Sequence, residues 1–349
     1  MKNISFLIAL ALSSNLLFSQ ADNATAQEAE RKKLMDASMN LENKEGWVRK
    51  GGVGLDLGQL ININPYVGAG SNRLGIGGAV MFKANLKRNL LSWNNEIGIN
   101  LSTQRIGSGT LSLGSDEKVP FEKALDIFNL SSNIAYKIGS NSPWAYSADL
   151  FFVSQFLNSN VDSATNKIYL KELHTGIYNT TLVSKFLSPA NFTFALGLKY
   201  QKQKNWYFFL SPIALKAIVI SDQEIANLGV HGTKLKANSL TEYNKSLLGL
   251  GALVRAGYTQ KVFNKINIGS EVLLFSDYLD NPQNIDLNWL NNLAVEIFKG
   301  FNLNLKLDLY YDDNKTNNIS DNNAIGGILG QGKRINLIQQ LLLSYNRSF

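Results

Sequence analysis

Side chains able to carry chemistry are sparse in this 349-residue chain. It has no cysteine and two histidines, His174 and His231, which excludes disulfides, thiol nucleophiles and thiolate metal sites. The best metal candidate is the adjacent pair Asp312 and Asp313, which several asparagines follow, because Ca²⁺ prefers oxygen ligands. Their spacing fits no Ca²⁺ loop pattern, so a solvated polar loop is the alternative. We expect no cofactor.

Catalysis by a nucleophile and a base is poorly supported. His174, beside Thr175, is the best candidate base, but no serine can be assigned to it as a nucleophile. We therefore expect that the protein is not an enzyme. The formal net charge is +7, yet lysine and arginine are scattered singly among acids and asparagines. No basic run indicates nucleic-acid binding.

The amino terminus predicts export from the cytoplasm. A charged head, Met1 to Asn3, precedes an apolar segment from Ile4 to Phe18, and small residues follow. This pattern is typical of a signal peptide over 1–20, with cleavage as late as residue 26. Residues 21–46 form a polar periplasmic segment. No later stretch has the ~18 consecutive apolar residues of a membrane helix.

From Gly51 onward, apolar and polar side chains alternate strictly, which separates two faces only in a β-strand. The clearest stretch is 301–311, where Phe301, Leu303, Leu305, Leu307 and Leu309 share one face. The alternation persists for eleven to sixteen residues per segment. That length favours membrane strands over the ~5–6-residue strands of a soluble sandwich. Aromatic residues near the segment ends are typical of membrane interfaces.

These segments predict an all-β protein, an antiparallel transmembrane β-barrel of the outer-membrane type over 47–349. Thirteen segments can be counted, including one that begins near Thr175. A barrel with both termini in the periplasm needs an even number. We place a further strand near Leu228–Lys236 and expect fourteen strands, with twelve as the alternative. The outer membrane is the expected location.

The chain ends as outer-membrane barrels do, on an aromatic residue in an amphipathic strand. Tyr345 and Phe349 share a face there and are the predicted signal for the barrel-insertion machinery. The expected partners are outer-membrane lipid, that machinery and other outer-membrane proteins.

The opposite strand faces should line the lumen. The predicted lumen-facing residues carry both signs of charge; they are Asn302, Asn304, Lys306, Asp308, Glu271, Glu296, Lys199 and Arg255. Opposite charges across a narrow lumen tend to pair and to narrow the passage. We therefore expect a non-enzymatic barrel that acts through protein contacts, such as an accessory or structural subunit of an envelope assembly or secretion complex. A diffusion channel or porin-like small-solute transporter is the alternative.

Several short motifs occur in an order that resembles a known family. They are Trp47 before Gly51-Gly52, Trp93-Asn94-Asn95, Lys123-Ala124-Leu125-Asp126, Phe186-Leu187-Ser188-Pro189-Ala190, Ser211-Pro212 with Lys216, Leu274-Phe275-Ser276-Asp277-Tyr278 and Tyr311-Asp312-Asp313. The chain resembles the Bacteroidota outer-membrane proteins grouped as domain-of-unknown-function family 3078. This resemblance implies an outer-membrane barrel and supplies no catalytic residues.

Overall fold

The computed structural model describes residues 44–63, 73–106, 122–163, 167–171, 180–203, 205–263, 265–312, 317–320 and 328–348. The predicted signal peptide, most of the polar segment after it, His174, Asp313 and Phe349 lie outside the described residues. Within the described ranges, no helix is long and apolar enough to cross a membrane.

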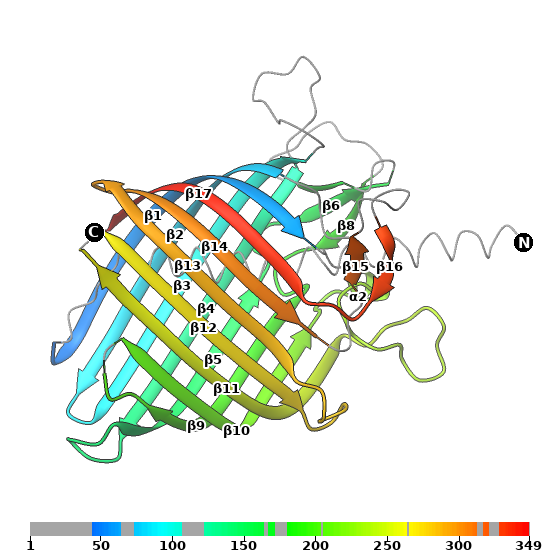
Figure 1. Cartoon of the computed structure of the whole chain (residues 1–349). Coiled ribbons are helices and arrows are strands. Elements are labelled where there is room, and N and C mark those ends of the chain that lie inside the picture. The colour runs from blue at the N-terminus through cyan, green and yellow to red at the C-terminus, as the bar shows by residue number, and fades with distance from the viewer. Residues whose placement is uncertain are drawn as a thin grey trace, which may run out of the picture.

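Twelve strands of the described part of the chain close into one antiparallel barrel (Figure 1). They are β1 (Gly46–Ile63), β2 (Arg73–Arg88), β3 (Leu91–Ile106), β4 (Glu122–Lys137), β5 (Trp144–Ser154), β9 (Ala190–Tyr200), β10 (Trp206–Val219), β11 (Ser246–Val262), β12 (Ile266–Asp277), β13 (Asp286–Phe298), β14 (Phe301–Tyr311) and β17 (Asn336–Ser348). Each pairs with its neighbours along the chain, and β17 closes the barrel by pairing with β1 and β14.

The prediction of fourteen strands is wrong, and the alternative of twelve is what the structure has. The segment assigned from Thr175 contains only β8 (Thr180–Ser184), which pairs outside the barrel with β6 (Ser159–Asp162). Leu228–Lys236 crosses nothing, because it follows the short helix α2 (Gln223–Asn227) in the connection between β10 and β11. Twelve of the thirteen predicted segments are barrel strands and the segment from Thr175 is not, so the even number is reached without a further strand.

The barrel wall has an apolar outer face and a largely buried inner face, as β14 illustrates. Leu303, Leu305 and Leu307 are exposed on the outside, whereas Asn304, Lys306 and Asp308 alternate with them and are buried inside. The period of two on a closed sheet places successive side chains on opposite faces of the wall. This combination defines a transmembrane β-barrel of the outer-membrane type.

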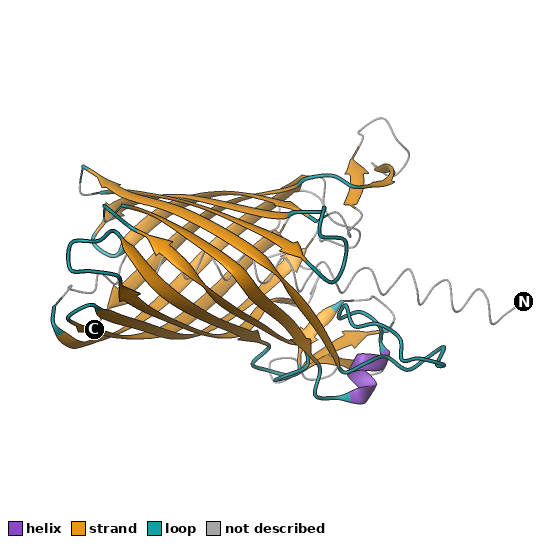
Figure 2. Cartoon of the chain, turned by 90° about the horizontal axis from the view of Figure 1, so that it is seen from below, coloured by secondary structure: helices purple, strands orange, loops and turns teal. Residues whose placement is uncertain are grey.

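The two ends of the barrel differ in the lengths of their connections. At one end, here called the turn end, short connections join β2 to β3, β5 to β4, and β13 to β14. The end of β17 lies at this end, beside the first part of β1 (Figure 1). At the other end, here called the loop end, the longer connections carry β6, β7 (Ile168–Leu170), β8 and α2, together with the two-stranded sheet of β15 (Asn317–Ser320) and β16 (Ile328–Gly332) (Figures 1 and 2).

Aromatic side chains ring the outer face at the turn end. Trp93, Trp144 and Trp206 each lie near the start of a strand that leaves this end. Tyr200 contacts both Trp144 and Trp206, with ring centroids 4.7 and 5.3 Å away. Amphipathic aromatic rings favour the membrane–water interface, so this girdle marks one boundary of the lipid-facing band.

Arginine in place of Leu305 should destabilise the barrel. Leu305 lies mid-strand on the exposed outer face of β14, so a charge there would meet hydrocarbon at a cost of about 2–4 kcal/mol. Urea-dependent folding into lipid vesicles measures the free energy of unfolding, and the Leu305→Met variant controls for the loss of the leucine. Equal stability of the Leu305→Arg and Leu305→Met variants would show that this face does not contact lipid.

Candidate functional site

An apolar cluster occupies the inner face of the wall formed by β9 to β12. Phe209, Leu253 and Phe275 are at most 3% exposed and pack with Ala195 and Ala214. A second inner cluster joins Leu125, Ile127 and Val153 on β4 and β5. The polar lumen expected from alternation is therefore interrupted by packed apolar side chains, which are typical of a filled interior.

On the turn-end side of the first cluster lies an interior charge cluster. The Arg255 guanidinium on β11 is 3.3 Å from the Asp149 carboxylate on β5. Because β9 and β10 separate these strands, the ion pair reaches across two intervening strands. Tyr207 on β10 donates a 2.6 Å hydrogen bond to Glu271 on β12, and the Lys199 ammonium lies 5.4 Å from the Tyr207 ring centroid. Five strands thus contribute to one interior charge cluster.

A separate ion pair lies within β14. The Lys306 ammonium and the Asp308 carboxylate are 2.9 Å apart, with 2% and 1% of their side chains exposed. Asp308 also accepts hydrogen bonds from the Asn291 backbone N–H and the Tyr310 hydroxyl. A buried pair of this kind is maintained only when its remaining polar atoms are bonded, and these contacts supply part of that bonding.

The structure distributes the predicted lumen-facing residues over two interior regions. Lys199, Arg255 and Glu271 meet in the interior charge cluster, and Asn304, Lys306 and Asp308 lie together on β14. Glu296 and Asn302 are register partners at the turn end of β13 and β14. Tyr345 is in β17, where its ring contacts Phe301.

The weak metal candidates gain no support from the geometry. Asp312 follows β14, and its neighbour Asp313 lies outside the described residues. Among the residues that the structure describes, no group of three or more His, Cys, Asp or Glu side chains is placed to hold a metal ion. We assign no metal site.

Asp149 and Tyr207 join the interior charge cluster although sequence reasoning did not single them out. Tyr207 falls in the run from Trp206 to Leu215, whose apolar residues hide the alternation of faces. Asp149 shares a face of β5 with the buried Ser147, opposite the exposed Leu150, so the alternation alone predicts that it points inward. The pairing of Asp149 with Arg255, 106 positions away, has no local signal in the sequence.

At the loop end, two connections fold together into one structure, here called the loop unit. It comprises the described residues of 155–189 and of 220–245. A buried core of Ile220, Ile225 and Ala226 packs against Leu182 and Tyr243. The core therefore draws on both connections, which makes the unit a small folded body rather than two independent loops.

Polar contacts join the two halves of the loop unit. Asp222 caps α2 by accepting a 2.9 Å hydrogen bond from the Glu224 N–H, and its other oxygen accepts a 2.6 Å bond from the Lys185 ammonium. The bond from Lys185 holds the pKa of Asp222 below its ordinary value. Ser188 and Ser221 bond through their hydroxyls at 2.8 Å.

The loop unit is anchored to the barrel at the loop end of β4. The Asp126 carboxylate is fully buried and accepts hydrogen bonds from the backbone N–H groups of Phe156 and Leu157. Lys123 pairs with Asp126 at 3.5 Å and donates a 2.6 Å hydrogen bond to Ser159. The start of the unit is thus fixed to a barrel strand.

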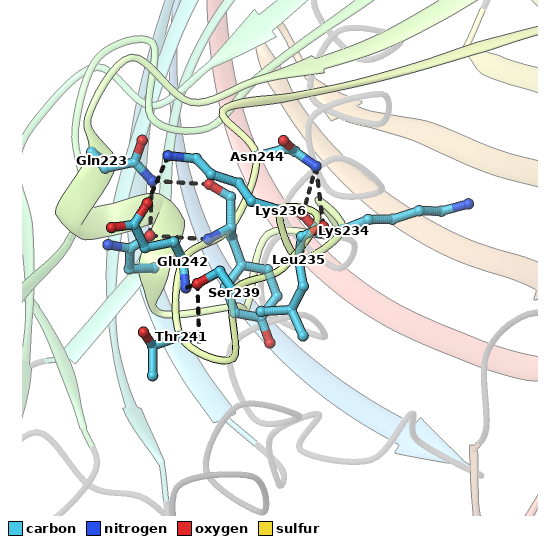
Figure 3. A network of polar contacts seen from close by, with 10 residues as sticks. Gln223, Lys234, Leu235, Lys236, Ser239, Thr241, Glu242 and Asn244 are labelled. Carbon is cyan, nitrogen blue, oxygen red and sulfur yellow. Dashed lines mark hydrogen bonds and ion pairs between the residues drawn. The ribbon is translucent and has the colours of Figure 1, made fainter.

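Residues 234–244 of the loop unit form a hydrogen-bonded hairpin (Figure 3). Lys236 and Glu242 form an ion pair at 2.9 Å, and Asn244 donates to the backbone carbonyls of Lys234 and Leu235. At the tip, the Ser239 hydroxyl accepts from the backbone N–H groups of Thr241 and Glu242. The side chain beside that turn, Leu240, is 94% exposed.

Comparison with known families agrees with the sequence resemblance. Residues 59–159 match the family described as "Protein of unknown function (DUF3078)", which confirms the resemblance to that family. No curated protein matches the chain significantly.

Known structures that resemble the chain are outer-membrane proteins. The translocator domain of the autotransporter NalP from Neisseria meningitidis is 12% identical, with a TM-score of 0.38, over 94% of this chain and 98% of that one. An outer membrane channel from Pseudomonas putida F1 is 12% identical, with a TM-score of 0.42, over 88% and 97%. The KdgM porin is 7% identical, with a TM-score of 0.31, over 84% and 98%. At these identities the likeness says nothing of function.

Acidification should loosen the loop unit through His231. Its Nε2 lies 3.0 Å from the Val183 carbonyl oxygen, to which it donates, and burial lowers its pKa to about 4. In the unfolded segment, His231 would bind a proton near its ordinary pKa of 6.5. Neutral His231 therefore contributes its whole stabilising free energy above pH 6.5, and this contribution is lost as the pH falls toward 4. Asp222 stays charged over most of this window, because its pKa is lowered.

Hydrogen exchange at the α2 amides, corrected for the intrinsic pH dependence, measures this loss. The His231→Gln variant retains a side-chain donor but cannot titrate, so its protection should vary much less between pH 6.5 and 4. The same pH dependence in both proteins would assign the effect to another group.

Proposed function

We propose that this protein is a non-enzymatic outer-membrane barrel that acts through protein contacts made by its loop unit. The main observation behind this proposal is that the two longest described connections fold together into the loop unit, which has its own buried core and its own anchor on β4. Connections that only join one barrel strand to the next need neither a core of their own nor an anchor on the barrel. The proposal assigns no reaction to the chain.

The orientation that accompanies this proposal puts the loop end outside the cell. Outer-membrane barrels have short periplasmic turns and longer extracellular loops. The turn end, with the start of β1 and the end of β17, then faces the periplasm, and both chain termini lie there. The loop unit is consequently accessible to a partner at the cell surface or to the extracellular part of another outer-membrane protein.

The hairpin 234–244 has the properties of a binding element. Hydrogen bonds and an ion pair fix its backbone before any partner arrives, which reduces the entropy lost on association. A nearly fully exposed leucine at its tip contributes nothing to packing within the chain. An apolar anchor of this kind gains free energy when a partner's pocket buries it.

A diffusion channel is the second candidate, favoured by the interior charge cluster. Arg255 and Lys199 lie on the inner wall with Asp149 and Glu271, and lumen charges of both signs can select solutes. The apolar cluster of Phe209, Leu253 and Phe275 weighs against an open passage, since it fills the same wall.

Planar-bilayer recording separates the two candidates. We expect little steady conductance from the purified protein, because apolar side chains and ion pairs occupy the interior. Replacing Arg255 by alanine would remove the ion pair to Asp149 and should still leave conductance low. Reproducible open steps in the unaltered protein whose size changes in the Arg255→Ala variant would establish the channel.

The Leu240→Ser variant should lose a protein partner without losing its fold. Tagged protein is recovered from native membranes in mild detergent, and the co-purifying proteins of the variant and the unaltered chain are compared by quantitative mass spectrometry. A partner held by the hairpin should fall by about tenfold or more, as expected for a buried apolar anchor.

The matched control is Phe263→Ser, because Phe263 is 87% exposed at the turn end of the barrel. It removes as much exposed apolar surface from the opposite end and should leave that partner unchanged. Equal loss in both variants, or in neither, would contradict a contact at the hairpin.

A further inference from the structure

A polar cluster lies on the lipid-facing wall near the turn end. The Trp93 indole N–H donates a 2.8 Å hydrogen bond to the Ser132 hydroxyl, which donates in turn to the Asn95 side-chain oxygen at 2.8 Å. The Asn95 amide donates to the Ala84 carbonyl at 3.2 Å. Three strands are thereby joined by polar side chains on the outside of the barrel.

The same arrangement occurs a second time on the outer wall. The Trp289 indole donates to Ser270, Ser270 donates to Asn291, and the Asn291 amide donates to the Leu307 carbonyl. Trp289 lies toward the loop end of β13. Polar groups in lipid must find partners within the protein. The need to hydrogen-bond Ser and Asn side chains on the wall is therefore enough to explain why this set of bonds occurs twice.

Among the described residues, a cation lies beside the first cluster and not beside the second. The register places Ala84 opposite both Asn95 and Arg49, so one lateral row of the outer wall contains Ser132, Asn95, Ala84 and Arg49. Arg49 is exposed on the same face as Trp47. Its guanidinium lies 5.9 Å from the Trp47 ring centroid, and no described carboxylate pairs with it.

The position of Arg49 along the wall determines which part of the lipid bilayer it contacts. Trp47 and Trp93, with ring centroids 5.6 Å apart, belong to the aromatic girdle at the turn end. Arg49 lies two residues from Trp47, on the side toward the barrel centre. Aromatic girdles lie at the level of the lipid headgroups, and an arginine just inside one extends back toward that level. The anions at this level are lipid phosphates.

We propose that the outer wall at the turn end of β1 to β4 binds the phosphate of a glycerophospholipid through Arg49. The planar guanidinium matches a phosphate with two donors at once, and Ala84 leaves room in the row between Arg49 and Asn95. The tilted rings of Trp47 and Trp93 flank the headgroup. This inference takes from the proposed function only the periplasmic direction of the turn end.

Lipid retained by the purified protein tests the proposal. The protein is extracted from native membranes in mild detergent and examined by native mass spectrometry, with lipids identified after release. We expect one retained glycerophospholipid per barrel, about tenfold less in the Arg49→Gln variant, and an intermediate amount in Arg49→Lys, which keeps the charge and loses the planar pair of donors.

The Arg88→Gln variant is the matched control, because Arg88, the last residue of β2, is also an exposed arginine. It should retain as much phospholipid as the unaltered protein. Heat-modifiable gel mobility shows whether each variant is folded. Folded Arg49→Gln that retains its phospholipid would overturn the site, and so would retained lipopolysaccharide in place of glycerophospholipid. Loss of protein contacts through the hairpin would leave this measurement unaffected.

Discussion

The closure of β17 onto β1 is the constraint on which the rest of the structure depends. In hydrocarbon every backbone N–H and C=O needs a partner within the protein, because no water replaces it. A sheet meets that demand only when it has no edge, and the register from Gly52 with Ser348 to Ile63 with Leu337 removes the last one. Closure also assigns every residue of the wall to one of two faces, since successive side chains point to opposite sides.

This assignment explains why the wall could be predicted from the sequence and the connections could not. Along β14 the leucines and the polar residues each have period two, so both faces follow from the residue types alone. The connections obey no such period. The segment predicted to begin near Thr175 resembles a wall strand, yet its described strand, Thr180–Ser184, pairs with β6 at the loop end. The fold class was therefore predictable, whereas the number of strands depended on one short segment.

The interior shows a second limit of sequence reasoning. Inward-facing residues could be named strand by strand, but the partners of each one depend on how the barrel curves. Arg255 meets Asp149 across two other strands, and Phe209, Leu253 and Phe275 gather from three. Contacts of this kind lie among residues far apart in the chain and share no local signal. Predicting that a face points inward is thus much easier than predicting whether the interior is open.

Polar side chains outside the interior follow one physical rule in two different settings. On the wall, Ser132 and Asn95 are bonded to Trp93 and to a backbone carbonyl, which satisfies them in an apolar surrounding. At the loop end, Asp126 of β4 and Asp222 of the loop unit accept backbone N–H groups that the connections would otherwise leave unbonded. In both settings a side chain completes the hydrogen bonding where the regular sheet does not. Arg49 differs because the described residues offer it an aromatic ring and no anion, whereas the membrane surface at the depth of the aromatic girdle carries anionic lipid phosphates.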